Sequence, residues 1–202
     1  MNRRPPPHKG CAMEQKKEMT KALLGCGLKE LMVSHPFEKI TIRMITDKAG
    51  VIRPTFYNYF QDKYELLEWI VCDDILNKVE EMLEHQMERE ALKLLFVLME
   101  NEKAFYRKAF QVTGQNSFES IMEHHLYQML EKRLEQAHLK TRKDVRILRK
   151  EVVAKYYAIG VVIVLKTWIL EGDEMFSAED AAEGFYFMMS HSIFDVVEKK
   201  EE

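Results

Sequence analysis

The chain has 202 residues, of which 47% are hydrophobic and 31% charged, and its formal net charge is −3. A chain of this length and hydrophobic content can bury a sizeable core, which excludes an intrinsically disordered protein. Glycine and proline are scarce, at eight and five residues, and alternating β-branched residues are nearly absent. This composition favours helices, so we predict an all-α fold.

The charge is distributed unevenly along the chain. Residues 1–63 contain 12 Lys and Arg against 6 Asp and Glu, whereas the remaining residues contain 18 against 27. A basic segment joined to an acidic one is typical of a protein that brings only one part of its surface to phosphates. The uneven charge therefore favours a nucleic-acid partner for the N-terminal part, although the negative total charge alone would argue against one.

The three cysteines, Cys11, Cys26 and Cys72, are far apart and lack the spacing of a disulfide framework or a zinc site. We therefore expect a protein of the reducing cytoplasm. Residues 1–13 begin with the basic, proline-rich MNRRPPPHKG, and we expect them to form a flexible tail. The longest apolar run, Tyr156–Leu165, has ten residues, whereas a span across a bilayer needs roughly 20, so no membrane segment is expected.

Two helices are expected in the first 50 residues. Helical spacing of apolar residues predicts the first helix over 14–33, and Pro36 prevents its extension. Thr41 is a suitable N-cap for a second, short helix over 41–48. Gly50 can adopt the left-handed conformation that ends this helix.

Two further helices follow at once. The third is expected over 52–59, because Pro54 is tolerated in the first turn of a helix, where its missing N–H has no intrahelical role. The fourth is expected to begin at Asp62, which forms a capping-box pattern with Glu65. An apolar run behind this pattern predicts that the helix continues past Leu76.

The rest of the chain is predicted to be helical, with breaks at Gly114, at Gly172 and before Ser177. We expect two domains after the tail, a helix-turn-helix DNA-binding domain at 14–63 and a helical dimerisation and effector or partner domain at 64–202. The expected helices of the second part cover residues 90–100, 102–113, 117–138, 144–171 and 177–198.

The two short helices around Gly50 are predicted to form a helix-turn-helix, in which the second helix enters the major groove of DNA. Phe56 and Phe60 lie four residues apart on one face of that helix and are expected to anchor it. The alternative is a hydrophobic cluster without a DNA role, which the basic charge of residues 1–63 disfavours. The predicted core residues of this domain are Ile45, Ala49, Gly50, Phe56 and Phe60.

The other face of the same helix carries polar groups suited to DNA. The hydroxyl groups of Tyr57 and Tyr59 can reach phosphate oxygens, and Arg53, Thr55 and Asn58 can reach base edges or nearby phosphates. A lysine in the first turn of the fourth helix is expected to add a cation beside N–H groups that favour anions. The predicted DNA-binding residues are Thr41, Arg43, Arg53, Pro54, Thr55, Tyr57, Asn58, Tyr59 and Lys63.

These residues resemble the head of the TetR-type regulators, which carries the pattern T-x-x-x-I-x-x-x-A-G-V-x-x-x-T-F-Y-x-Y-F-x-x-K. The chain departs from the family at position 52, where a serine commonly caps the recognition helix and this chain has Ile52. Pro54 is expected to compensate by pre-organising the first turn. The matching residues are Thr41, Ile45, Ala49, Gly50, Val51, Thr55, Phe56, Tyr57, Tyr59, Phe60 and Lys63.

The resemblance extends over most of residues 14–195. The segments EKITI, FQDKYELLEW, FYRKAFQVTGQNSF and GVVIVLKTWILEG are similar to the TetR-type subgroup of dihydroxyacetone kinase regulators. This resemblance implies an all-helical homodimer that controls transcription, with genes of glycerol or dihydroxyacetone metabolism as targets. It also implies that a partner protein resembling the kinase subunit carries the regulatory signal.

The last two expected helices are apolar over a wide arc. Two such helices from each of two chains can bury this surface as a four-helix interface, so we expect a C2 dimer that binds a pseudo-palindromic operator in double-stranded DNA. The predicted interface residues are Val152, Ile159, Val162, Ile163, Phe185, Met188 and Met189.

Several alternatives remain open for the second domain. Its methionines and aromatic residues favour a packed core, and the alternative is an adaptable pocket for an apolar small-molecule effector. The basic segment 138–150 is either a solvated connection or a docking surface for an acidic partner. An interaction module with a vestigial helix-turn-helix is the alternative to a DNA-binding regulator.

No residue pattern predicts an enzyme. The chain lacks a G-x-S-x-G elbow, an H-E-x-x-H pair and a phosphate-binding loop. His124 and His125 are adjacent, and adjacent side chains of a helix point about 100° apart, so they do not form a metal-ligand pair. We therefore expect no metal and no cofactor.

Overall fold

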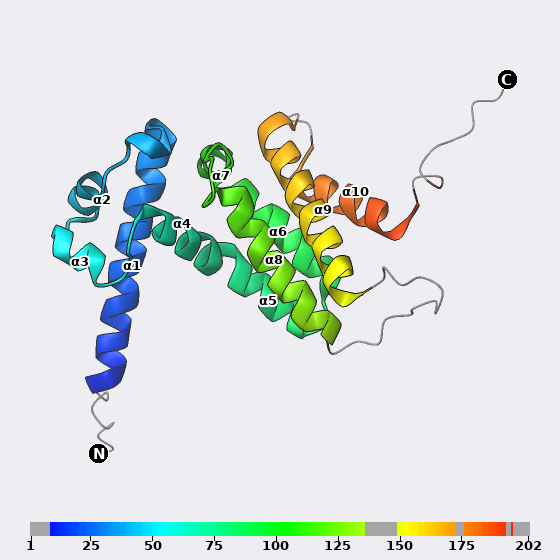
Figure 1. Cartoon of the computed structure of the whole chain (residues 1–202), viewed down its shortest axis with the longest axis horizontal. Helices are drawn as coiled ribbons and strands as arrows, with labels where there is room; N and C mark the ends of the chain where they lie inside the picture. Colours follow the sequence, from blue (N-terminus) through cyan, green and yellow to red (C-terminus); the bar gives the residue numbers. More distant parts are fainter. Residues whose placement is uncertain (1–8, 136–148, 173–175, 193–194, 196–202) are drawn as a thin grey trace, which may run out of the picture. The chain divides into compact units, whose positions relative to one another are not determined.

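The computed structural model describes residues 9–135, 149–172, 176–192 and 195, and these residues form helices and connections without a strand (Figure 1). The predicted all-α fold is confirmed for this part of the chain. The structure divides into two compact units, one ending at Ile70 and the other beginning at Val71. We call them the head and the body.

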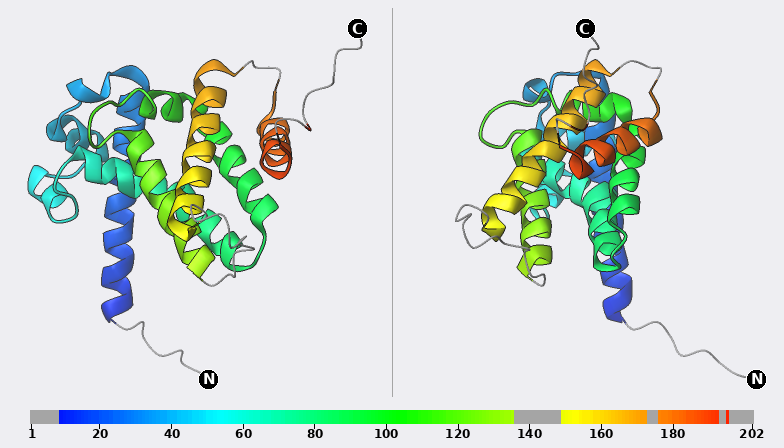
Figure 2. Two further views of the ribbon diagram at one scale, coloured as in Figure 1. Left: turned by 45° about the vertical axis from the view of Figure 1, so that its right-hand side comes forward. Right: turned by 90° about the vertical axis from the view of Figure 1, so that its right-hand side faces the viewer.

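The head consists of a long helix followed by four short elements. Residues 9–13, expected to belong to a flexible tail, form the beginning of the long helix, whose N-terminal part extends beyond the other elements of the head (Figure 2). The elements are α1 (Lys9–Ser34), the 3-10 helix η1 (Phe37–Lys39), α2 (Ile42–Ala49), α3 (Arg53–Tyr57) and α4 (Lys63–Val71).

The ends of α2 and α3 follow from the local chemistry of the sequence. The Thr41 hydroxyl accepts a hydrogen bond from the Met44 N–H at 3.2 Å, which confirms Thr41 as the N-cap of α2. Gly50 ends α2 with a φ of 67°, a left-handed conformation that glycine adopts without steric cost. Helix α3 starts with Pro54 in its first turn and is shorter than expected, because it ends before Asn58.

The head core lies where α2, α3 and α4 meet α1. Ile45, Phe56 and Phe60 are buried in it, whereas Ala49 is half-buried and Gly50 is exposed, so these two do not fill the core as expected. Gly50 instead makes the turn between α2 and α3.

A glycine permits the close approach of α1 to α2. A Cβ atom added at Gly27 would lie 3.2 Å from the Ile45 carbonyl oxygen and 3.5 Å from the Ala49 nitrogen. On the adjacent side of α1, a Cβ atom at Gly25 would lie 3.1 Å from the Trp69 ring. Gly27 thus lets the backbones of α1 and α2 approach closely, and Gly25 makes room for the Trp69 and Ile70 side chains of α4.

The body contains the remaining helices. Both junctions around η2 keep right-handed helical backbone angles, in agreement with the expected helix that continues past Leu76. The elements are the π-helix η2 (Cys72–Leu76), α5 (Asn77–Glu84), α6 (Glu88–Asn101), α7 (Lys103–Ala109), α8 (Phe118–Glu135), α9 (Lys150–Glu171) and α10 (Ala178–Ser190).

Several predicted helix bounds differ from the observed ones. Helix α7 ends at Ala109 rather than at residue 113, and α10 ends at Ser190, since His191 already has an extended backbone. Residues 136–148, which include most of the basic segment and the expected start of α9, lie outside the described residues.

Helices α8 and α9 pack side by side along most of their length, and α6 lies against α5 and α10. Between these helices and α7 lies an aromatic core. Tyr106, Phe118 and Phe96 are almost fully buried, and Phe110 meets Phe118 edge to face with ring centroids 4.9 Å apart. Burial raises the pKa of the Tyr106 phenol well above its usual range. Most of the aromatic side chains of α7 and the start of α8 thus form packed core.

Helix α9 is long and apolar enough, by length and composition alone, to cross a membrane. The buried side chains of a soluble protein's core helix have the same composition. Seven residues of α9 are buried within the body, namely Ala154, Ala158, Val161, Val162, Leu165, Trp168 and Ile169.

Candidate nucleic-acid interface

Helices α2 and α3, joined by the turn at Gly50, form the predicted helix-turn-helix. The Phe56 ring is fully buried and anchors α3 in the head core. Phe60, just after the helix, is also buried. The structure leaves the opposite surface of α3 open, with Arg53, Pro54 and Asn58 exposed. This surface is available to a partner while the rings beneath it stay in the core.

Arg53 and Tyr57 form a pair on the open surface of α3. The Arg53 Nη2 atom donates to the Tyr57 hydroxyl at 3.0 Å, and the guanidinium lies 5.5 Å from the centre of the Tyr57 ring. The Tyr57 ring in turn meets the buried Phe56 ring edge to face. The pair is therefore held in position before any ligand binds, which reduces the entropy lost on binding.

Thr55 and Tyr59 are half-buried, so less of each side chain is open to a partner than expected. Thr41 is exposed at the start of α2, and its hydroxyl accepts from the backbone but keeps its own proton to donate. Arg43 is 86% exposed and lies 3.5 Å from Asp47, an exposed ion pair that constrains it little.

Lys63 lies in a different environment from the one expected. Its ammonium donates to the carbonyl oxygens of Phe37, Glu38 and Ile40 at 2.7, 3.3 and 2.9 Å, and it lies 4.6 Å from the centre of the Phe37 ring. An ammonium has three protons, so all of them are used within the head. Burial lowers the pKa of Lys63, and the negative charges of Glu38 and Asp62 partly oppose this shift.

The N–H groups at the start of α4 are also occupied, so they cannot bind an external anion. The Asp62 carboxylate accepts from the N–H groups of Tyr64 and Glu65 at 2.8 and 3.0 Å. These are the donors that Lys63 was expected to complement beside a phosphate. In this structure Lys63 ties α4 to η1, so the prediction of a phosphate contact for this residue is corrected.

The predicted interface residues of α9 and α10 divide into two groups. Ile163 and Met188 are each 51% exposed, Val152 is exposed, and Ile159 and Met189 are half-buried. Val162 and Phe185 are buried within the body, at 0% and 6% exposure. Val162 therefore offers no surface to a second subunit, and its interface prediction is wrong. Phe185, although buried, lines the groove between α9 and α10, so its interface role stays a prediction. The aromatic residues Tyr156, Tyr157, Tyr186 and Phe187 of these two helices are also exposed, and the periodic pattern did not single them out.

The body contains an apolar cavity of about 330 Å³ between α5, α6, α8, α9 and α10. The polar groups at its wall belong to Glu88, Tyr157, Tyr186 and Ser190. Its apolar wall includes Val79, Leu92, Leu95, Leu126, Met129 and Val161. A cavity of this size and lining has the properties of a site for a small apolar molecule.

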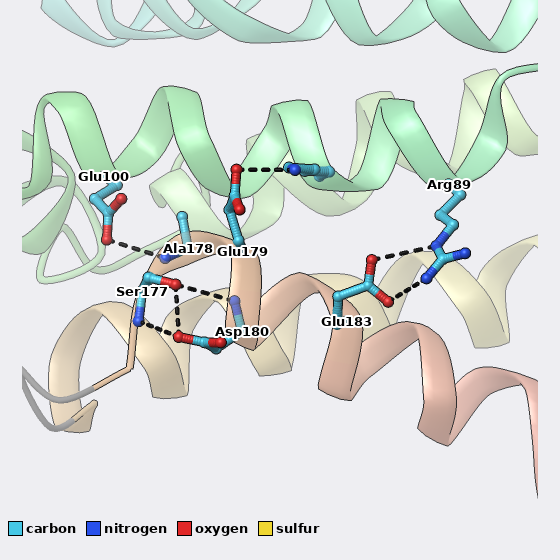
Figure 3. A network of polar contacts seen from close by, with 8 residues as sticks. Arg89, Glu100, Ser177, Ala178, Glu179, Asp180 and Glu183 are labelled. Atoms are coloured by element: carbon cyan, nitrogen blue, oxygen red, sulfur yellow. Dashed lines mark hydrogen bonds and ion pairs between the residues drawn. The ribbon is translucent and has the colours of Figure 1, made fainter.

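Helix α10, which closes one side of this cavity, is held on α6 by polar contacts (Figure 3). The Arg89 guanidinium binds the Glu183 carboxylate with two hydrogen bonds, and this holds the pKa of Glu183 below its usual range. One turn away, Lys93 pairs with Glu179 at 2.8 Å.

At the start of α10, the Ala178 N–H donates to the Glu100 carboxylate of α6 at 3.0 Å (Figure 3). Ser177 and Asp180 close the same end as a capping box. This polar row adds to the packing of α10 against α6.

The described part of the body has no group of three or more His, Cys, Asp or Glu side chains that could hold a metal ion, and neither has the described part of the head. His125 lies 3.6 Å from the Cys72 sulfur through its Nε2 atom. The His124 and His125 rings are 5.5 Å apart.

Comparisons with known families match both units. Residues 28–70 match the profile described as bacterial regulatory proteins, tetR family. Residues 86–191 match the profile described as transcriptional regulator C-terminal region. A similar curated protein is the HTH-type dhaKLM operon transcriptional activator DhaS of Lactococcus lactis subsp. lactis (strain IL1403). It is 26% identical over 161 residues, which cover 80% of this chain and 85% of that protein.

Solved structures share the fold. The dihydroxyacetone kinase operon activator DhaS has a TM-score of 0.63 at 24% identity, covering 85% of this chain and 94% of its own. NalD of Pseudomonas aeruginosa, the secondary repressor of the MexAB-OprM multidrug efflux pump, has a TM-score of 0.63 at 14% identity, with coverages of 87% and 95%. Thermus thermophilus FadR in complex with lauroyl-CoA has a TM-score of 0.57 at 17% identity, with coverages of 90% and 98%.

The family profiles thus cover the helix-turn-helix with the end of α1, nearly all of α4 and most of the body. The similar structures have the same all-helical fold over nearly their whole length. The chain belongs to the TetR family, whose members are transcriptional regulators and not enzymes.

Proposed function

We propose that this TetR-family protein is a dimeric, sequence-specific DNA-binding regulator whose targets are genes of dihydroxyacetone or glycerol metabolism. The observation that carries the DNA-binding part is the open surface of α3. There a pre-organised Arg53–Tyr57 pair and the exposed Asn58 amide stand above a buried aromatic anchor. The excess of basic residues in the first 63 residues supports it, since non-specific attraction to DNA is electrostatic.

We assign separate roles to the residues around the recognition helix. Arg53, Thr55 and Asn58 read base edges, because their side chains can bond to the donors and acceptors of the major groove. Thr41, Arg43, Tyr57 and Tyr59 bind phosphates and so set the register of the head on the duplex. Pro54 fixes the backbone angle φ in the first turn of α3. It contacts the DNA backbone without a hydrogen bond from its own nitrogen, because proline has no N–H.

The similarity to DhaS supports the metabolic assignment, since that relative is described as the activator of the dhaKLM operon and matches 80% of this chain. We infer that a partner protein resembling a dihydroxyacetone kinase subunit binds the body and carries the signal. The protein acts in the cytoplasm, where its DNA lies.

The dimer forms through the exposed apolar face of α9 and α10. This face includes Tyr156, Ile163, Phe187 and Met188, whose side chains are between 44% and 72% exposed. Regulators of this family bind DNA as homodimers. A two-fold dimer places two recognition helices on one face of the duplex, so the operator is pseudo-palindromic.

A second candidate function is a repressor that responds to an apolar small molecule. The specific observation in its favour is the apolar cavity of the body, with its few polar groups at the wall. The solved structure of FadR with lauroyl-CoA is an example of a structural relative with an acyl ligand. Release of operator DNA by such a molecule, and not by a kinase-like protein, would favour this alternative.

The test is a selection of bound fragments from the source genome at several salt concentrations, with the full chain. We expect a pseudo-palindromic site near dihydroxyacetone or glycerol genes. The control is the double variant Arg53→Ala/Asn58→Ala, which should keep its fold and lose the selected sequence. A palindrome elsewhere in the genome would refute the metabolic assignment alone. Absence of enrichment at every salt concentration would refute the DNA-binding proposal and favour an interaction module with a vestigial helix-turn-helix.

A further inference from the structure

Ile52 stands at an unusual place for an aliphatic side chain. It is 70% exposed and immediately precedes the first residue of α3. It occupies the N-cap position with φ −82° and ψ 149°, and its side chain makes no capping hydrogen bond. Serine, threonine, asparagine and aspartate are preferred there, because their side chains accept a hydrogen bond from an N–H of the first turn.

The local backbone explains why the helix does not need a capping side chain. A capping group accepts hydrogen bonds from the second or third N–H of the helix. In α3 the second residue is Pro54, which has no N–H, and the third N–H, that of Thr55, already donates to the Ile52 carbonyl oxygen at 2.9 Å. The side chain of residue 52 is therefore free for another role.

The position of Ile52 defines that role once α3 is accepted as the recognition helix. The N-terminal residues of a recognition helix are those that contact base edges in the major groove. The apolar group that bases present there is the C5 methyl of thymine. An exposed branched hydrocarbon beside the exposed Arg53 can bury that methyl while Arg53 bonds a neighbouring base.

We propose that Ile52 determines sequence specificity by packing against the methyl group of one thymine in each operator half-site. This inference rests on the proposed DNA-binding function. It assigns to position 52 a direct readout of sequence in place of helix capping. Burial of a methyl group is worth about a fourfold change in affinity, so the contact discriminates modestly at each half-site.

The experiment replaces each thymine of the selected operator, one at a time, by deoxyuridine, which lacks only the methyl group. Wild-type protein is expected to bind about fourfold more weakly for one thymine position in each half-site, the factor for one buried methyl. Ile52→Ala and Ile52→Ser should bind thymine and uracil DNA equally at that position. The matched control is Val33→Ala, which shortens an aliphatic side chain exposed on α1 and should keep the uracil effect.

Circular dichroism and thermal melting of each variant verify that the head is folded. Wild-type protein that binds its operator equally with or without every thymine methyl overturns the inference. The same uracil penalty in Ile52→Ala also overturns it, because the methyl would then be read by another residue. Failure of wild-type protein to bind any DNA would refute the proposed function itself, and this inference with it.

Discussion

Lys63 is an example of a residue whose type suggests one role and whose contacts indicate another. A lysine at the start of a helix near a recognition element is compatible with a phosphate contact. Here its three protons are bound by carbonyl oxygens of η1 and of Ile40, and Asp62 already occupies the N–H groups of the first turn. Its cation therefore stabilises the junction between η1 and α4.

Replacing Lys63 by methionine, which keeps the aliphatic chain over Phe37, should lower the free energy of unfolding of the head by about 1.5–3 kcal/mol, the range for hydrogen bonds to a charged group. Urea denaturation measures this change. Lys39→Met, at an exposed position, is the control and should leave stability unchanged. A Lys63→Met protein of normal stability with a reduced salt dependence of DNA binding would restore the phosphate role.

Arg43 and Asn58 allow the two kinds of DNA contact to be separated. Arg43→Ala should weaken binding to all sequences and reduce the slope of log affinity against log salt by about one. Asn58→Ala should cost about 1–3 kcal/mol for the preferred base pair and relax the preference at that position alone. Binding titrations on operator and random duplexes measure both effects. Equal changes for the two variants on both duplexes would contradict the assignment.

The packing of the head requires close contact between α1 and α2. Gly27 leaves no room for a large side chain, because its neighbours are the backbone atoms of Ile45 and Ala49 and these cannot rotate away. In the body, a row of ion pairs and hydrogen bonds between α6 and α10 adds to the packing of these two helices. Packing thus joins the helices of the head, and polar contacts supplement packing in the body.

Gly27→Leu should separate α1 from α2 and destabilise the head by about 1–3 kcal/mol, the usual cost of overpacking. The comparison is Gly184→Ala in α10, where an added Cβ meets nothing within 4 Å. That change should be neutral or stabilise α10 by about 0.5–1 kcal/mol, since alanine favours helix over glycine. Thermal melting measures both variants. A Gly27→Leu protein as stable as wild type would show that α1 and α2 need not approach so closely.

The exposed apolar face of α9 and α10 is the surface through which we propose that two chains associate. Aromatic and aliphatic side chains of this face lie side by side, with the Tyr156 and Tyr157 rings 5.2 Å apart. A groove of about 300 Å³ between the two helices is lined by residues that include Tyr156, Ile163 and Met188. Apolar surface that is contiguous and rimmed by polar residues is typical of an association site.

The double variant Ile163→Asp/Met188→Asp should convert the proposed dimer to a monomer, because burying two unpaired carboxylates costs several kcal/mol. Sedimentation velocity measures the mass, and circular dichroism should show unchanged helix content. Gln128→Asp, on the exposed side of α8, is the control and should remain a dimer. Affinity for the full palindrome should fall in the monomer more than affinity for a half-site. A double variant that remains a dimer would place the interface elsewhere.

The helical fold and the helix-turn-helix could be predicted from the sequence, because they depend on local chemistry. The Thr41 cap and the left-handed turn at Gly50 act within a few residues of the chain, and the four-residue spacing of Phe56 and Phe60 is also local. Local patterns of this kind are read from residue type and spacing alone. The absence of a capping group at Ile52 was likewise evident from the residue itself.

Which side chains face inward in the body, and where Lys63 points, depends on contacts between segments that are far apart in the chain. Apolar residues occur on every side of α9, so spacing could not distinguish the buried Val162 from the exposed Ile163. That choice depends on α8, which covers one side of α9 from more than 20 residues earlier in the chain. Lys63 bonds carbonyl groups 23 to 26 residues away, and contacts at such separations have no periodic signature in a single sequence.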